Sequence, residues 1–262
     1  MNTTISLKAK KQAGEKISCL TVYDASFAEV LEAAGVDLFL VGDSLGMVVQ
    51  GQETTLPVAL DEMIYHAAAV RRGAANSFIV VDLPFMSYST PELALQSAGE
   101  VMKKSGANMV KLEGGSEMLE AVELLSSRGI PVCAHLGLLP QSVHKLGGYR
   151  VQGKTEESGL KLLEDAVAME GAGADMLVLE CVPAELAKRI SQNVEMPVIG
   201  IGAGVDCDGQ VLVLYDMLNI SKGKRPKFSK NFLEGKSSIS DAISAYVKAV
   251  KSKEFPALEH SF

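Results

Sequence analysis

The segment at residues 172–180 reads Ala-Gly-Ala-Asp-Met-Leu-Val-Leu-Glu. Its glycine is typical of a helix end, its apolar run of a buried strand, and a carboxylate follows where that strand stops. Residues 34–43 (Ala-Gly-Val-Asp-Leu-Phe-Leu-Val-Gly-Asp) and 105–113 (Ser-Gly-Ala-Asn-Met-Val-Lys-Leu-Glu) repeat this order. We interpret the recurrence as one helix-to-strand turn used several times, and not as proof of an internal duplication.

Short apolar runs of this kind alternate with longer amphipathic stretches along the whole chain. Several runs are rich in Val, Ile and Leu throughout, which is typical of parallel strands buried on both faces. Eight such runs predict an α/β fold, a single (β/α)8 barrel of the TIM type. The runs are residues 18–23, 38–42, 78–83, 109–112, 131–134, 176–179, 197–201 and 211–214.

Helical spacing fills most of the intervals between these runs. Proline near a helix start and glycine past its end are the expected punctuation. Between residues 201 and 211 a helix does not fit, and we expect a short turn at 206–210. No linker rich in Pro, Gly or Ser divides the chain, so we expect residues 1–262 to form one domain. The predicted helices cover residues 27–34, 91–106, 118–127, 159–170 and 237–251.

The composition is that of a globular protein, because 47% of the residues are hydrophobic and 22% are charged. A net charge of -7 with scattered Lys and Arg argues against a nucleic-acid partner or an anionic membrane surface. The densest basic group, residues 222–230, is interrupted by Gly223, Pro226 and Phe228 and is interpreted as a solvated loop.

The sequence has no pattern typical of an export signal or a membrane-spanning helix. Residues 1–16 are polar and lack the apolar core of a signal peptide. No apolar run approaches the roughly 20 residues that a membrane-spanning helix needs. The four cysteines, Cys19, Cys133, Cys181 and Cys207, form no C-x-x-C pair. We therefore expect reduced thiols in a cytoplasmic protein.

Polar residues stand at or just after the ends of most predicted strands, where a barrel of this kind carries its active site. Five of the first six strands end in a carboxylate, and clustered carboxylates repel one another unless a cation neutralises them. Oxygen ligands without a His or Cys cluster favour a hard ion, Mg²⁺ first and Mn²⁺ tolerated. The candidates are Asp24, Asp43, Ser44, Asp82, Lys111, Glu113, His135 and Glu180.

Three of these acids, Asp43, Asp82 and Glu113, follow neighbouring strands and could share one ion. Taken singly, each also fits an ordinary helix cap or turn. Because Lys111 lies on the same predicted strand as Glu113, we favour a common site.

Other features are interpreted as structural. Gly200-Ile-Gly-Ala-Gly204 lacks the last glycine of G-x-G-x-x-G and is interpreted as a close-packed strand end. We expect His66 to be structural, His260 to be solvated, and Cys181 to be a small buried residue instead of a nucleophile. Residues 147–153, Gly-Gly-Tyr-Arg-Val-Gln-Gly, are expected to form a flexible lid loop.

These residues resemble the ketopantoate hydroxymethyltransferase family. The match is collinear from about Thr4 to Phe262 and so covers nearly the whole chain. Its stretches are VGDSLG at 41–46, DLPFM at 82–86, VKLEGG at 110–115, HLGL at 135–138, PQS at 140–142, GGYRVQG at 147–153, LECVP at 179–183, IGIGAG at 199–204 and PKF at 226–228. The stretch at 222–225, Lys-Gly-Lys-Arg, is more basic than the family leads us to expect.

The resemblance implies a barrel of the phosphoenolpyruvate mutase and isocitrate lyase type, an Mg²⁺ ion and a homo-oligomer, usually a decamer. The family's metal positions fall on Asp43, Asp82 and Glu113. Its 2-oxo acid contacts fall on Asp43, Ser44, Asp82 and Lys111.

The implied reaction transfers a hydroxymethyl group from 5,10-methylenetetrahydrofolate to 3-methyl-2-oxobutanoate, giving 2-dehydropantoate in the first step of pantothenate biosynthesis. A metal held by the ketone and carboxylate would polarise the substrate, and Lys111 would stabilise the developing charge. The family's base falls on Glu180, which would remove the proton from carbon 3, and His135 matches a position near the substrate.

Two alternatives stay open. One is an Mg-dependent lyase or mutase of the same superfamily, but the lyases carry Lys-Lys-Cys-Gly-His where residues 103–106 here read Lys-Lys-Ser-Gly. The other is a non-catalytic 2-oxo acid binding protein. Glu180 weighs against it, because binding alone needs no base.

Overall fold

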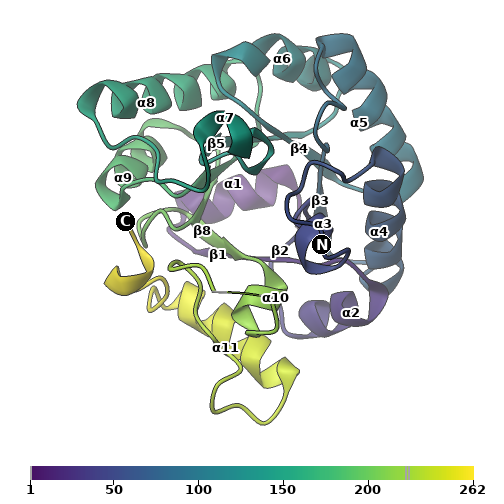
Figure 1. Cartoon of the computed structure of the whole chain (residues 1–262), viewed down its shortest axis with the longest axis vertical. Helices are drawn as coiled ribbons and strands as arrows, with labels where there is room; N and C mark the ends of the chain where they lie inside the picture. The colour runs from purple at the N-terminus through teal and green to yellow at the C-terminus, as the bar shows by residue number, and fades with distance from the viewer. Residues whose placement is uncertain (1, 222, 224) are drawn as a thin grey trace.

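A closed barrel of parallel strands forms the centre of the molecule (Figure 1). The computed structural model describes residues 2–221, 223 and 225–262, and these form eight strands in chain order, with the last paired to the first. The predicted barrel is confirmed. The strands are β1 (Ile17–Thr21), β2 (Leu38–Val41), β3 (Phe78–Asp82), β4 (Met109–Glu113), β5 (Val132–Gly137), β6 (Met176–Glu180), β7 (Val198–Ile201) and β8 (Gly209–Leu212).

Helices surround the barrel in Figure 1, and the five predicted helices are present. The best punctuated is α5, which is capped by Thr90, begins at Pro91 and ends before Gly106 in the left-handed conformation. The helices are α1 (Thr4–Gln12), α2 (Ala25–Ala33), α3 (Leu45–Val48), α4 (Leu60–Gly73), α5 (Pro91–Ser105), α6 (Leu119–Ser127), α7 (Val143–Leu146), α8 (Glu156–Gly171), α9 (Ala184–Asn193), α10 (Leu214–Met217) and α11 (Ile239–Lys251), with 3-10 turns at Ser116–Met118, Pro140–Ser142 and Leu258–His260.

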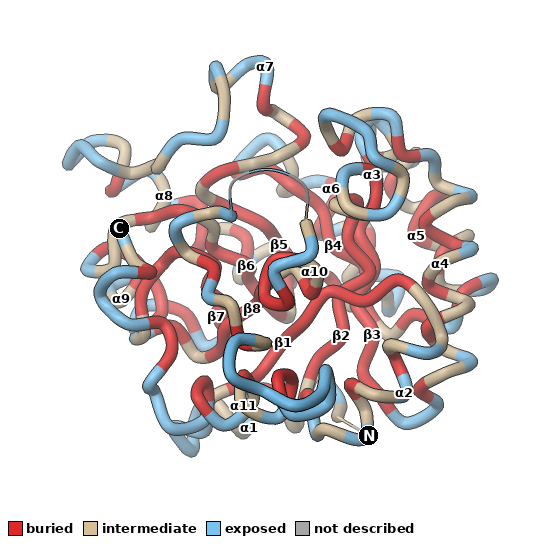
Figure 2. Tube along the Cα trace, turned by 60° about the horizontal axis from the view of Figure 1, so that its bottom comes forward, coloured by how far each residue is buried: buried red, intermediate tan, exposed pale blue. Residues whose placement is uncertain are grey.

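Two apolar layers hold this arrangement together. One lies between the strands and the outer helices, and the strands in Figure 2 are accordingly buried along their length. The other fills the inside of the barrel, where Phe78, Met109 and Met176 meet. Leu7 of α1 joins this inner layer and is fully buried, so α1 closes one end of the barrel.

The last strand departs from the prediction. It begins at Gly209, two residues before the predicted start, and Leu214 belongs to α10. Strand pairing needs no apolar side chain, and Gly209 fits because a Cβ there would lie 2.4 Å from the carbonyl oxygen of Ile17. The predicted absence of a helix between β7 and β8 is confirmed for the described residues.

None of the helices in the described part of the chain has the length and hydropathy of a membrane span. The basic stretch at 222–225 cannot be compared in full, because Lys222 and Lys224 lie outside the described residues.

Candidate active site

One cavity of about 530 Å³ opens at the carboxyl ends of the strands. All the predicted strand-end residues except Asp24 line it. Asp24 instead caps α2, where its carboxylate accepts a hydrogen bond from the Phe27 backbone at 2.9 Å. The predicted ring of five acids is therefore corrected to four.

Strand alternation brings these side chains together. On β4, Met109 lies in the apolar interior, and Lys111 and Glu113 follow at two-residue steps on the same face. The lower part of the barrel is therefore apolar and its mouth is polar. The same alternation places the other inward groups, which are Asp82, His135 and Glu180.

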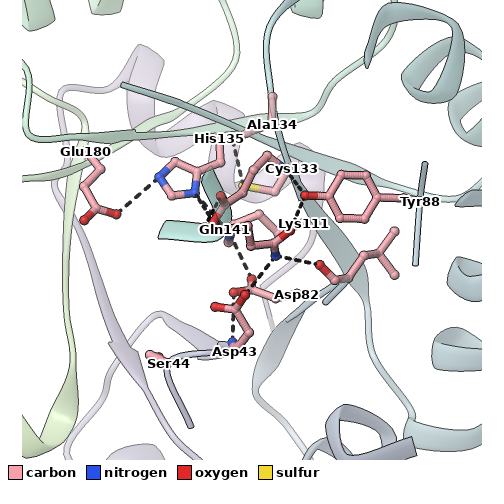
Figure 3. A network of polar contacts seen from close by, with 12 residues as sticks. Asp43, Ser44, Asp82, Tyr88, Lys111, Cys133, Ala134, His135, Gln141 and Glu180 are labelled. Carbon is pink, nitrogen blue, oxygen red and sulfur yellow. Dashed lines mark hydrogen bonds and ion pairs between the residues drawn. The ribbon is translucent and has the colours of Figure 1, made fainter. Parts of the chain in front are cut away.

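Asp82, Lys111, Glu113 and His135 form a buried polar network. Figure 3 shows Asp82, Lys111 and His135 of this network. Lys111 Nζ lies 3.3 Å from Asp82 Oδ1, 3.1 Å from His135 Nδ1 and 3.9 Å from Glu113 Oε1. The backbone N–H of Asp43 donates to Asp82 Oδ2 at 3.1 Å. The loop after β2 is thereby joined to the end of β3.

The charged groups in this network shift one another's pKa values. Burial and the nearby Asp82 and Glu113 charges raise the pKa of Asp43 to about 8. Burial also raises the pKa of Asp82, although Lys111 opposes that shift. Burial alone would lower the pKa of Lys111, but Asp82, Glu113 and Asp43 together raise it above its usual value. The ammonium of Lys111 therefore stays charged.

The pKa of Glu113 is shifted in the opposite direction, below its usual value. Burial would raise its pKa, but His135, Lys111 and a backbone hydrogen bond from Gln141 lower it. Glu113 is thus the most readily ionised member of this cluster, and Asp43 is a carboxyl that holds its proton near neutral pH.

His135 links the cluster to Glu180. Its Nδ1 lies 3.4 Å from Glu113 Oε1, and its Nε2 lies 3.3 Å from Glu180 Oε2, although no described group makes an aligned hydrogen bond with Nε2. Burial and Lys111 lower the pKa of His135, while Glu113 and Glu180 raise it to a net value above the usual one. Glu180 is more open, with 13% of its side chain exposed against 3% for Glu113.

Ser44 lies on the opposite wall. Its hydroxyl lies 2.9 Å from the hydroxyl of the buried Tyr23, which donates to Thr21 Oγ1 at 2.8 Å. A phenol has a single hydrogen, so Ser44 donates to Tyr23. This bond holds the Ser44 side chain at the cavity wall.

Two residues in the network were missed by the sequence analysis. Gln141 donates through Nε2 to Asp43 Oδ2 at 2.8 Å and through its backbone N–H to Glu113 Oε2 at 3.0 Å. Tyr88 donates to Gln141 Oε1 at 2.5 Å and accepts from the Glu113 backbone at 3.3 Å. Each follows a strand end by a few residues, and Gln141 also lies in the PQS stretch at 140–142 that resembles the family.

The rim of the cavity comes from two loops. Tyr149, Arg150 and Val151 of the predicted lid segment line it, although the flexibility expected of that segment stays a prediction. Lys227 and Phe228 line it as well. Lys227 is exposed, as expected of a solvated loop, whereas Phe228 is half-buried and departs from that prediction.

The remaining predictions concern single side chains. His66 Nδ1 lies 2.7 Å from the Tyr23 carbonyl oxygen, as suits a structural role. Cys181 is buried, and burial raises the pKa of its thiol. His260, expected in solvent, is only 7% exposed and packs on the Phe255 ring at 5.2 Å, so that prediction is wrong.

The acids at the mouth of the barrel are candidate ligands for a cation. Among the described residues, no three His, Cys, Asp or Glu side chains are already grouped as a metal site. The donor set nevertheless fits a hard divalent ion. Four carboxyl groups crowd around Lys111 and His135 and repel one another, and a divalent cation would relieve that repulsion. Asp82 Oδ1 is buried and makes no aligned hydrogen bond with the described groups, although Lys111 Nζ lies 3.3 Å away.

Comparisons with solved structures show the type of barrel. A 2,3-dimethylmalate lyase of the PEP mutase/isocitrate lyase superfamily shares 18% identity and a TM-score of 0.58, covering 98% of this chain and all of that chain. A phosphonopyruvate hydrolase in complex with oxalate and Mg²⁺ shares 11% identity and a TM-score of 0.62, covering 81% of each chain. The expected barrel type is confirmed.

Comparisons by sequence find relatives of much higher identity than these solved structures. The profile of a family described as ketopantoate hydroxymethyltransferase matches residues 1–258. A relative from Nitrosococcus oceani, named 3-methyl-2-oxobutanoate hydroxymethyltransferase, is 61% identical over 260 residues, which cover 99% of this chain and 98% of the relative. The chain therefore belongs to the ketopantoate hydroxymethyltransferase family.

Proposed function

We propose that this chain transfers a hydroxymethyl group from 5,10-methylenetetrahydrofolate to 3-methyl-2-oxobutanoate, giving 2-dehydropantoate in the first step of pantothenate biosynthesis. The observation that carries the proposal is that Glu180 and the buried acid cluster line one cavity and are linked through His135. Bond formation at carbon 3 of a 2-oxo acid needs a base beside that carbon and positive charge beside the ketone.

Asp43, Asp82 and Glu113 would hold Mg²⁺, with Mn²⁺ tolerated. When bound, the cation polarises the ketone and offsets the negative charge of the enolate. The repulsion among the crowded acids and the lack of an aligned hydrogen bond at Asp82 Oδ1 support this assignment. The phosphonopyruvate hydrolase complex adds support, because oxalate offers two adjacent oxygens, as a 2-oxo acid does.

The 2-oxo acid would contact Asp43, Ser44, Asp82 and Lys111. Lys111 keeps its positive charge because three acids surround it, so it can attract the substrate's oxygen side throughout the reaction. Ser44 is held at the cavity wall by Tyr23 and offers its oxygen from the β2 side.

Glu180 would remove the proton from carbon 3. It ends β6, and Asp43 follows β2 on the far side of the eight-stranded barrel, so a small acid held by the cluster would present carbon 3 to Glu180. His135 Nε2 lies 3.3 Å from Glu180 Oε2 and would hold that carboxylate in place. Overall, a C–C bond forms between carbon 3 and the methylene carbon of the donor, and both C–N bonds of that methylene group break. Water would supply the hydroxyl oxygen, the two folate nitrogens would take up the proton from carbon 3 and one from water, and tetrahydrofolate would leave.

The cavity also has room beyond a small branched acid. Its upper wall is largely apolar and includes Tyr149, Val151 and Phe228, which suits an aromatic co-substrate such as the folate. We propose further that residues 1–262 act as one domain, that the chain assembles as a homo-oligomer, by family resemblance a decamer, and that it works in the cytoplasm.

A product assay tests the proposed function. Protein, Mg²⁺, 3-methyl-2-oxobutanoate and the folate donor should together yield 2-dehydropantoate, EDTA should abolish the product, and added Mg²⁺ should restore it. A lyase or mutase would instead convert a 2-oxo acid without the folate. A binding protein would retain the acid and form no product.

A further inference from the structure

Gln141 connects the ends of neighbouring strands at the cavity. It stands in the 3-10 turn after β5 and is only 6% exposed. Both side-chain N–H groups are used, one on Asp43 Oδ2 at 2.8 Å and the other on the Leu83 carbonyl oxygen at 3.0 Å. Its side-chain oxygen accepts from Tyr88, and its backbone N–H donates to Glu113 Oε2 at 3.0 Å. Figure 3 shows Gln141 between these groups.

The three cluster acids share a pattern of contacts. In each, a backbone or side-chain amide N–H holds one oxygen: Gln141 Nε2 holds Asp43, the Gln141 backbone holds Glu113, and the Asp43 backbone holds Asp82. The second oxygen of each acid is thereby left to the other groups of the cluster. Two of the three holding groups belong to Gln141.

Only a carboxamide of this length satisfies all of these partners. Two donors are needed for Asp43 and Leu83, and one acceptor is needed for Tyr88. A carboxylate would lose both donors, and an apolar side chain would lose all three bonds. The hydroxyl of Tyr88 also fixes which end of the amide faces Asp43.

We propose that Gln141 is a positioning residue that holds one oxygen each of Asp43 and Glu113, so that their free oxygens are arranged for a divalent cation. This inference rests on the cation assignment within the proposed function. Gln141 contacts the proposed ligands but is not among the residues that line the cavity. Groups that orient metal ligands in this way typically contribute 10–100-fold in metal affinity.

The test is a titration with Mn²⁺ alone, in which the electron paramagnetic resonance signal of the free ion gives the dissociation constant. Gln141→Met keeps the length and removes the three side-chain bonds, and we expect binding to weaken by about 10–100-fold. Tyr88→Phe leaves both Gln141 donors but removes the hydroxyl that bonds to the Gln141 side chain and to the Glu113 backbone. The amide is then free to turn, and we expect a smaller loss of about fivefold, the scale of a hydrogen bond.

Gln210→Met is the matched control. Gln210 is equally buried, at 3% exposure, but its side chain donates to the Gly204 carbonyl oxygen at 2.9 Å, away from the acids. We expect wild-type Mn²⁺ affinity for this variant. Melting temperatures in EDTA identify variants that merely unfold, and Tyr88→Phe, which removes a single hydroxyl, then carries the test.

The outcomes are distinct. Wild-type affinity in both Gln141→Met and Tyr88→Phe would overturn the proposal, as would equal weakening in Gln210→Met. If the wild-type protein binds Mn²⁺ but forms no 2-dehydropantoate, the proposed function fails and the role of Gln141 stands. A wild-type protein that binds no Mn²⁺ overturns the cation assignment and this inference with it.

Discussion

Lys111 Nζ lies 3.3 Å from Asp82 Oδ1, and both side chains are buried at the mouth of the barrel. Although Asp82 stands at the end of a strand, it is therefore a buried acid that forms an ion pair. Its pKa is raised, mainly by burial and despite Lys111, so the folded state disfavours its ionised form.

From this relationship we expect Asp82→Asn to weaken Mn²⁺ binding by at least about tenfold while the fold survives. The amide removes a charge that the folded state disfavours, so the free energy of unfolding at pH 7 should change by less than about 1 kcal/mol. Mn²⁺ titration and urea unfolding measure the two effects. Unchanged Mn²⁺ affinity would remove Asp82 from the proposed ligands.

The assembly prediction concerns the outer surface. Large apolar side chains are exposed there, including Tyr65 at 67%, Met86 at 59% and Leu258 at 94%. Together with the family resemblance, this motivates the proposed homo-oligomer. Light scattering should give a mass several times that of the 27.8 kDa chain, and a mass near 27.8 kDa would contradict the proposal.

At the opposite end of the barrel lies Asp37, a carboxylate whose pKa is lowered instead of raised. Asp37 accepts hydrogen bonds from the backbone and hydroxyl of Ser18 at 2.9 and 2.8 Å, and it pairs with Lys251 and Lys10. Burial would raise its pKa, but Lys251 and Ser18 lower it below the usual value. Asp37 thereby joins β1, the turn before β2 and α11.

The sign of the pH dependence follows. A folded-state pKa below the unfolded value of about 3.9 adds stability above that pH, and the contribution is lost as the pH falls through the folded pKa. Asp37→Asn should therefore lower the free energy of unfolding by about 1–2 kcal/mol at pH 7. The difference from wild type should shrink below about pH 4. Urea unfolding at pH 7, 5 and 3.5 tests this, and a difference independent of pH would refute it.

Much of the fold could be predicted from local sequence. The strand runs of 78–83 and 176–179 are apolar except for Asp82, because parallel strands are buried on both faces, and this run of apolar residues identifies them. The start of β8 was missed because Gly209 and Gln210 have no apolar pattern, and their pairing with β1 and β7 depends on backbone geometry.

The site was predictable in part. A shared cavity for six of these residues was predicted because strand ends converge at one edge of a barrel, and their roles stay predictions. The six are Asp43, Asp82, Glu113, Lys111, His135 and Glu180. Asp24 has the same place in the sequence but caps a helix, and its position before α2 was an available signal. Gln141 lies in the PQS stretch that resembles the family, but its role could not be predicted, because its partner Asp43 lies 98 residues away and only tertiary packing brings them together.

Glu180 is expected to remove the proton from carbon 3 of the 2-oxo acid. Glu180→Gln preserves the shape of the side chain but not its basicity. Metal and 2-oxo acid should bind this variant normally. Glu185→Gln, an exposed change in the first turn of α9, is the control and should behave as wild type.

The most direct measurement is the exchange of the carbon-3 hydrogen of 3-methyl-2-oxobutanoate with deuterated solvent, followed by proton NMR in the presence of Mg²⁺. It needs no folate and isolates the proton step. We expect the wild-type protein and Glu185→Gln to exchange this hydrogen rapidly, and Glu180→Gln to be slower by about 10² or more. Exchange by Glu180→Gln at the wild-type rate would contradict the account and make His135 the next candidate base.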